Sequence, residues 1–166
     1  MVAIFQAALD SDIDNARLLF REYQEWLGLS LCFQNFEEEV AGLPGRYAPP
    51  EGRLLLAAVD GEVAGCVALR KLEDGVCEMK RLYVRTAARG SGLGVKLIDA
   101  VLGSARSIGY ARMRLDTLPS KMGKAVDLYR SYGFVPIPAY YPNPVPGSIY
   151  LEKDLAEVHI PWPKLP

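Results

Sequence analysis

Two Asp-Gly pairs, Asp60-Gly61 and Asp74-Gly75, constrain the fold of this chain more than any other feature of its sequence. Asp-Gly between strand-like runs is a strong short-range signal for a β-hairpin, because tight hairpin turns need the positive φ that these residues tolerate. The runs beside the two pairs cover 54–59, 62–71 and 76–84. The middle of the chain is therefore predicted to form three antiparallel strands in a meander.

The segments on either side of this meander alternate between strand and helix patterns. Before it, we predict a strand, a helix capped by Ser11 and a short helix after Asn35, over 2–9, 12–27 and 36–43. After it, we predict helix, strand, helix and two strands, over 93–108, 112–118, 120–132, 134–137 and 148–155. The order β-α-α-β-β-β-α-β-α-β-β requires a mixed sheet with helices on both faces, so the fold class is α/β or α+β.

Length and composition indicate one globular domain over residues 1–166, since 50% of the residues are apolar and 23% are charged. The three cysteines form no CxxC pair, and the only histidine, His159, lies in a proline-rich tail, so we expect no metal site. We expect Cys32, Cys66 and Cys77 to be buried packing residues in a reducing, cytoplasmic protein. No apolar stretch is long enough to span a membrane.

The charge is distributed unevenly along the chain. A net charge of −1 disfavours a general nucleic-acid binder, because such proteins usually carry a basic excess. Residues 80–130, however, hold eleven basic and three acidic side chains, a local charge of +8 that leaves −9 for the remainder. The basic segment is either a set of solvated helix faces or the docking place of a small polyanion.

A glycine-rich loop, Arg89-Gly90-Ser91-Gly92-Leu93-Gly94, lies between a predicted strand and a predicted helix. Free backbone N–H groups and the positive end of the helix dipole make such a loop an anion site. A dinucleotide GxGxxG would need glycine at Val95, and a P-loop would need glycine at Leu118, so neither motif is present. The alternative is a turn that only lets the helix pack closely.

On this loop and on a second motif, the chain resembles the GNAT superfamily of acyl-CoA N-acyltransferases. Arg89, Gly92 and Gly94 match the first motif of that family, and the run from Ala125 through Leu128-Tyr129 to Gly133-Phe134 matches the second. The resemblance covers 2–155 and implies a mostly antiparallel central sheet flanked by helices on both faces. Met122 stands where members often carry asparagine, and Thr86 where they often carry proline.

The resemblance also implies where a cofactor, acetyl-CoA, would bind. Its pyrophosphate would lie on the N–H groups of residues 90–95, and Arg89 and Tyr129 would also contact the cofactor. Its pantetheine arm would pair with the backbone of β-strand residues 82–84. In residue terms the predicted cofactor site is Leu82, Tyr83, Val84, Arg89, Gly90, Ser91, Gly92, Leu93, Gly94, Val95 and Tyr129. The Leu82 N–H would point at the thioester carbonyl and stabilise its developing negative charge.

Two side chains are predicted to move protons. Glu78 lies where some GNAT members place a catalytic glutamate, and a regular strand would put it on the same face as Leu82. The alternative for Glu78 is a structural ion pair with Lys80, Arg81 or Arg114. Tyr129 matches the family's position for the acid that protonates the leaving thiolate, although its helical spacing equally suits a core residue.

The acceptor is expected to approach opposite the cofactor, over Phe33, Gln34 and Tyr141. Aromatic residues there favour an apolar or aromatic amine, and the acidic remainder of the chain favours a cationic one. The alternative is that these aromatic residues are scattered over the surface and form no acceptor site. We therefore predict an N-acetyltransferase that moves an acetyl group from acetyl-CoA to the primary amine of a small molecule or peptide by direct attack in a ternary complex.

Two other functions stay open. A non-catalytic CoA-binding regulatory module would keep the glycine loop without acceptor chemistry, and a nucleic-acid modifier would use the basic segment. Neither a nucleic acid nor a membrane is an expected partner, and the sequence leaves a homodimer open.

Overall fold

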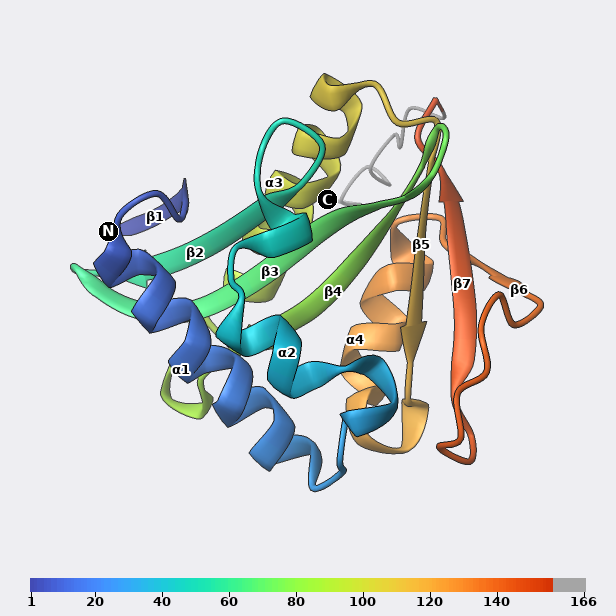
Figure 1. The fold of residues 1–166 in the computed structure, drawn as a ribbon, viewed down its shortest axis with the longest axis horizontal. Helices are drawn as coiled ribbons and strands as arrows, with labels where there is room; N and C mark the ends of the chain where they lie inside the picture. The colour runs from blue at the N-terminus through green and yellow to red at the C-terminus, as the bar shows by residue number, and fades with distance from the viewer. Residues whose placement is uncertain (157–166) are drawn as a thin grey trace, which may run out of the picture.

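The computed structural model describes residues 1–156 and contains one mixed sheet in the strand order β1-β2-β3-β4-β5-β7-β6 (Figure 1). The strands are β1 (Val2–Gln6), β2 (Arg53–Val59), β3 (Glu62–Glu73), β4 (Val76–Val84), β5 (Arg112–Thr117), β6 (Val135–Ile137) and β7 (Ile149–Asp154). The predicted meander is confirmed as β2, β3 and β4, which pair antiparallel in sequence order. Among the described strands, only β4 and β5 pair in parallel.

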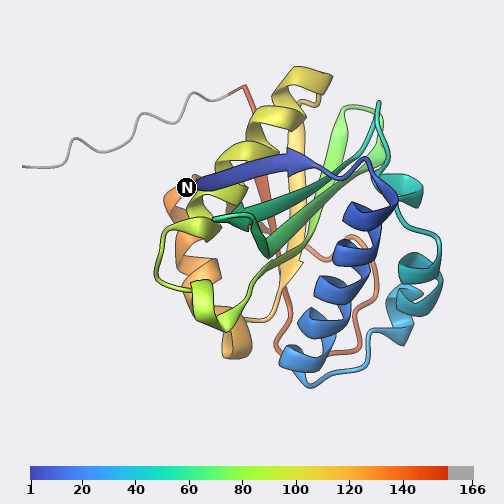
Figure 2. The ribbon, with the colours of Figure 1, turned by 90° about the vertical axis from the view of Figure 1, so that its left-hand side faces the viewer.

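Helices cover both faces of the sheet, as Figure 2 shows. They are α1 (Asp10–Leu27), α2 (Phe36–Ala41), α3 (Leu93–Ile108) and α4 (Pro119–Ser131), with short 3-10 turns η1 (Cys32–Gln34), η2 (Gly45–Tyr47) and η3 (Thr86–Ala88). The sheet and α1 with α2 enclose one core, which includes Phe20 and Phe36. The sheet and α3 with α4 enclose the other, which includes Leu97 and Val101. The predicted fold class is confirmed.

Several local predictions need correction. Helix α1 begins two residues before the predicted start, because the Asp12 carboxylate accepts the N–H groups of Ala8 and Leu9 at 3.0 Å each and Ser11 lies inside the first turn. Cys32 is exposed on η1, whereas the other two cysteines are buried as predicted. The proline-rich tail with His159, and a domain reaching Pro166, lie outside the described residues. No helix within residues 1–156 is long and apolar enough to cross a membrane.

Strand β4 is irregular in two ways that create the site. It pairs with β5 only where Val76–Glu78 face Arg112–Arg114, and beyond this point the two strands separate. Its ladder with β3 shifts register between Cys66 and Ala68, opposite Arg81, whose φ is +62°. A β-bulge of this kind adds an unpaired residue and changes which face the following side chains occupy. The sheet therefore opens between β4 and β5, beside a bulge.

Candidate active site

A groove follows the open end of β4 on the side of α3 and α4. Nine of the predicted cofactor residues line it: Leu82, Tyr83, Val84, Arg89, Gly90, Gly92, Leu93, Gly94 and Val95. Of the two predicted cofactor residues that do not, Ser91 donates its hydroxyl to the Ala88 carbonyl oxygen at 2.5 Å, and Tyr129 lines a different cavity. The structure thus gathers the loop and the strand into one concave surface.

The glycine loop presents backbone N–H groups to this groove. Gly90 and Gly92 have φ of +80° and +81°, which turns the chain sharply into α3. The Lys96 N–H donates to the Gly92 carbonyl at 3.2 Å, so the N–H groups of residues 93–95 precede the hydrogen-bond ladder of α3. A Cβ on Gly92 or Gly94 would meet no protein atom within 4 Å, so the space before the loop is open. Residues 90–95 therefore fit an anionic pyrophosphate.

The edge of β4 presents further unpaired groups. The Arg85 N–H donates to Ala64 on the β3 side at 2.8 Å, and N–H directions alternate along a strand, so those of Leu82 and Val84 face away from β3 into the groove. The Val84 carbonyl oxygen already accepts a hydrogen bond from Arg89 Nε at 3.0 Å. The Arg89 guanidinium lies 4.7 Å from the centre of the Trp26 ring. An amide-containing arm could pair with the free N–H groups as an additional strand would.

A second cavity opens on the side of α1 and η1, where the acceptor was predicted. Phe33 and Gln34 line it together with Lys80, Asp116, Thr117 and Tyr129. Gln34 donates its Nε2 to the Tyr141 hydroxyl at 2.9 Å, across 107 positions of sequence, and that hydroxyl donates to the Asp116 carboxylate. The three predicted acceptor residues are therefore brought together. Leu82 and Met122 line both the cavity and the groove, so the two meet there.

Tyr129 also lines this cavity. Its side chain is 5% exposed, and its ring packs against Phe134 with centroids 5.7 Å apart. Burial, together with Tyr23 and Asp116, raises the pKa of its hydroxyl, so the group stays protonated at neutral pH. Within the described residues the hydroxyl makes no hydrogen bond, which leaves its proton available to a ligand.

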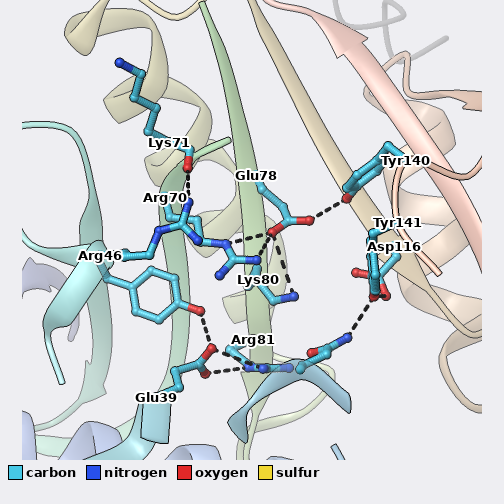
Figure 3. A network of polar contacts seen from close by, with 12 residues as sticks. Glu39, Arg46, Arg70, Lys71, Glu78, Lys80, Arg81, Asp116, Tyr140 and Tyr141 are labelled. Atoms are coloured by element: carbon cyan, nitrogen blue, oxygen red, sulfur yellow. Dashed lines mark hydrogen bonds and ion pairs between the residues drawn. The ribbon is translucent and has the colours of Figure 1, made fainter. Parts of the chain in front are cut away.

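Glu78 is held in a buried ion-pair network (Figure 3). Its side chain is 1% exposed, and one carboxylate oxygen lies 2.8 Å from Arg70 while the other accepts the Tyr140 hydroxyl at 2.6 Å. Lys80 is farther away, with its Nζ at 3.8 Å. Burial favours the neutral carboxyl, but Lys80, Arg70 and Tyr140 outweigh it, so the pKa of Glu78 is lowered.

The prediction that Glu78 and Leu82 share a face of β4 is wrong. Met79 and Leu82 both contact the core beneath α3, although three positions separate them, because the bulge at Arg81 inserts an extra residue. Glu78 therefore points to the side of α1, and it does not line the cavity. A structural role, the alternative that the sequence left open, matches these surroundings, with Arg70 as an ion-pair partner that the sequence did not indicate.

Sequence reasoning missed three polar residues of the cavity, Lys80, Asp116 and Thr117. Asp116 Oδ2 accepts hydrogen bonds from Tyr141 and from Asn143, the latter at 3.0 Å, while Oδ1 accepts none from the described residues. Thr117 is 5% exposed, and its Oγ1 has no hydrogen-bond partner. One signal in the sequence could have found two of them: Asp116 and Thr117 are polar residues at the end of β5, where that strand separates from β4.

Comparison with known proteins decides the family. A model of the Acetyltransferase (GNAT) family matches residues 14–134. The chain belongs to this family. It is 39% identical over 158 residues to an uncharacterized N-acetyltransferase of Schizosaccharomyces pombe, covering 94% of this chain and 96% of the relative. The predicted family and the prediction of an acyltransferase are thereby confirmed.

Solved structures agree with the GNAT fold. A GNAT acetyltransferase of Staphylococcus aureus superposes with a TM-score of 0.77 at 19% identity, covering 93% of this chain and 99% of the other. YncA of Salmonella typhimurium, solved with its cofactor acetyl-CoA, superposes with a TM-score of 0.69 at 19% identity, covering 96% and 97%. The predicted cofactor is the one that this structural neighbour carries.

Proposed function

We propose that this GNAT enzyme transfers an acetyl group from acetyl-CoA to the primary amine of a small molecule or peptide, by direct attack in a ternary complex. The observation that carries the proposal is the meeting of the groove and the cavity at Leu82 and Met122. Two ligands can therefore occupy the protein at once with their reacting groups adjacent, which removes much of the entropic barrier of a reaction between two molecules.

The groove supplies the donor side of this reaction. The N–H groups of residues 90–95 would hold the pyrophosphate, and the free N–H groups of Leu82 and Val84 would pair with the pantetheine arm. When bound, acetyl-CoA supplies an activated thioester. The Leu82 N–H, beside the cavity, would donate to the thioester carbonyl oxygen as negative charge develops on it.

Asp116 would take the proton from the incoming ammonium. An alkyl amine with a pKa near 10.4 is only about 0.04% neutral at pH 7, a cost of roughly 4.6 kcal/mol that a base must help to overcome. Asp116 lines the cavity and keeps one oxygen free of hydrogen bonds to the described residues, whereas both Glu78 oxygens are engaged. Asp116 is therefore better placed for this step than Glu78.

Tyr129 would complete the transfer by donating its hydroxyl proton to the departing thiolate. The amine nitrogen forms its bond to the carbonyl carbon as the carbon–sulfur bond breaks. The nitrogen loses two protons, one through Asp116 and one after attack; one of them replaces the proton that Tyr129 gives to the thiolate, and the other reaches solvent. Because burial raises the pKa of Tyr129, the hydroxyl stays protonated until the thiolate forms and accepts its proton.

The test is radiolabelled acetyl transfer to a panel of primary amines, with Asp116→Asn beside the wild type. We expect transfer by the wild type, and a kcat about 10²-fold lower in Asp116→Asn that recovers as rising pH deprotonates the amine itself. Asp127→Asn, at an exposed position on α4, is the matched control and should act as wild type. Binding of acetyl-CoA with no transfer to any amine would instead favour the non-catalytic module.

A further inference from the structure

The charged groups around the acceptor cavity balance in number but are unequally paired. Arg81 is paired with Glu39 at 2.9 Å, and Arg70 is paired with Glu78 at 2.8 Å. Lys80 and Asp116 also line or adjoin this space, yet they form no ion pair with each other within 4.0 Å. Lys80 has only the Glu78 carboxylate, at 3.8 Å, which it shares with Arg70, and Asp116 forms no ion pair among the described residues.

Of Lys80 and Asp116, Lys80 has the weaker polar contacts. Its residue is 6% exposed, yet the carboxylate oxygen nearest to its ammonium, on Glu78, lies 3.8 Å away, beyond hydrogen-bonding distance. The centre of the Tyr141 ring is 5.9 Å from Nζ. In Figure 3 a dashed line joins the Lys80 ammonium to the Glu78 carboxylate. Among the described residues this ammonium has no hydrogen bond and only a shared carboxylate at 3.8 Å, so an anionic ligand here would stabilise it.

Two further polar atoms of the same cavity lack partners. Thr117 Oγ1 and Gln34 Oε1 are buried and form no hydrogen bond with any residue of 1–156. A threonine hydroxyl can donate to an anion, whereas an amide oxygen can only accept. Together with Lys80 and with the free oxygen of Asp116, the wall thus offers donors for an anion and acceptors for an ammonium.

We propose that the acceptor is a small amino carboxylate. Lys80 and Thr117 bind its carboxylate, while Asp116 and Gln34 Oε1 hold its amine for attack. The inference rests on the proposed function, because it names the substrate class of that same site. It replaces the cationic acceptor that the charge balance of the sequence favoured, since Glu39 and Glu78 are already neutralised by arginines.

The experiment compares each standard L-amino acid and β-alanine with its own carboxamide as an acceptor of radiolabelled acetyl. We expect at least one carboxylate to exceed its amide by about 10- to 100-fold in kcat/KM, the usual range for a hydrogen-bonded charge. Lys80→Met should raise KM for that carboxylate by a similar factor, and by much less for its carboxamide. Lys71→Met, at a half-exposed lysine of β3 that does not line the cavity, is the matched control and should behave as wild type.

The outcomes separate this inference from the proposed function. Equal use of carboxylates and amides by the wild type would overturn the inference but leave an amine acetyltransferase. An equal loss for both acceptors in Lys80→Met, with acetyl-CoA affinity and melting temperature intact, would also overturn it, since Lys80 would then serve the chemistry. If no amine is acetylated, the proposed function fails. Calorimetry of the same amino acids with the wild type then decides the inference, which fails if none binds.

Discussion

Replacing Glu78 by glutamine separates a structural role from a catalytic one. Glutamine has nearly the same shape and keeps an oxygen that can accept the Tyr140 hydroxyl, but it removes the negative charge. Arg70 and Lys80, whose side chains are 22% and 4% exposed, then lose the carboxylate that faces them. The substitution therefore leaves buried positive charge without its partner.

The size of the effect follows from this burial. Breaking one side of a buried ion pair costs about 3–5 kcal/mol of unfolding free energy. We expect the lower end, about 3 kcal/mol, because the retained oxygen preserves one hydrogen bond and because water reaches part of Arg70. For a protein of this length, that loss corresponds to a melting temperature lower by about 6–12 °C.

The pH dependence gives a second signature. The pKa of Glu78 is lower in the folded protein than the value near 4.3 of an unfolded glutamate, because Lys80 and Arg70 outweigh desolvation. Its contribution to stability is therefore fully present above the unfolded pKa and is lost as pH falls through the folded pKa. The unfolding free energies of the wild type and Glu78→Gln should differ most near neutral pH and converge in acid.

The assay is denaturant unfolding followed from neutral to acidic pH, together with kcat for acetyl transfer at neutral pH. Glu62→Gln, at an exposed position of β3, is the matched control and should change stability by less than about 0.5 kcal/mol. A structural Glu78 predicts lost stability with a kcat within a few-fold of wild type. Unchanged stability with a kcat at least 100-fold lower would refute the reasoning and restore Glu78 as the catalytic base.

Two other variants address the groove and the acid. Tyr129→Phe should lower kcat by about 10²-fold without changing acetyl-CoA affinity or melting temperature, because the hydroxyl forms no hydrogen bond within the described residues; a full rate would remove Tyr129 from the mechanism. Gly92→Val should abolish acetyl-CoA binding measured by calorimetry, because a β-branched residue at φ of +81° is strained and its side chain would fill the open space before the loop. Unchanged affinity in a folded Gly92→Val protein would contradict the pyrophosphate site.

Local sequence patterns predicted most of the elements because the signals that specify them are short-range. The Asp-Gly turns fixed the meander, and apolar residues at helical spacing predicted α1 and α3 to within two residues. Their limits appear at the first turn of α1, where Asp12 rather than Ser11 supplies the capping oxygen. Both residues favour caps, and only the backbone path decides which carboxylate or hydroxyl reaches a free N–H.

The sequence by itself determined the strand, glycine loop and helix of the cofactor groove, because a contiguous segment carries that geometry. Tertiary structure decided which side chains face the cavity on the other side of the sheet. The bulge at Arg81 arises from pairing with β3, and it put Glu78 and Leu82 on different faces. The cavity combines η1, β4, β5 and the loop before β7, so that Gln34 meets Tyr141 across 107 positions. No local pattern encodes such contacts, because they depend on how sheet register and helix packing bring distant segments together.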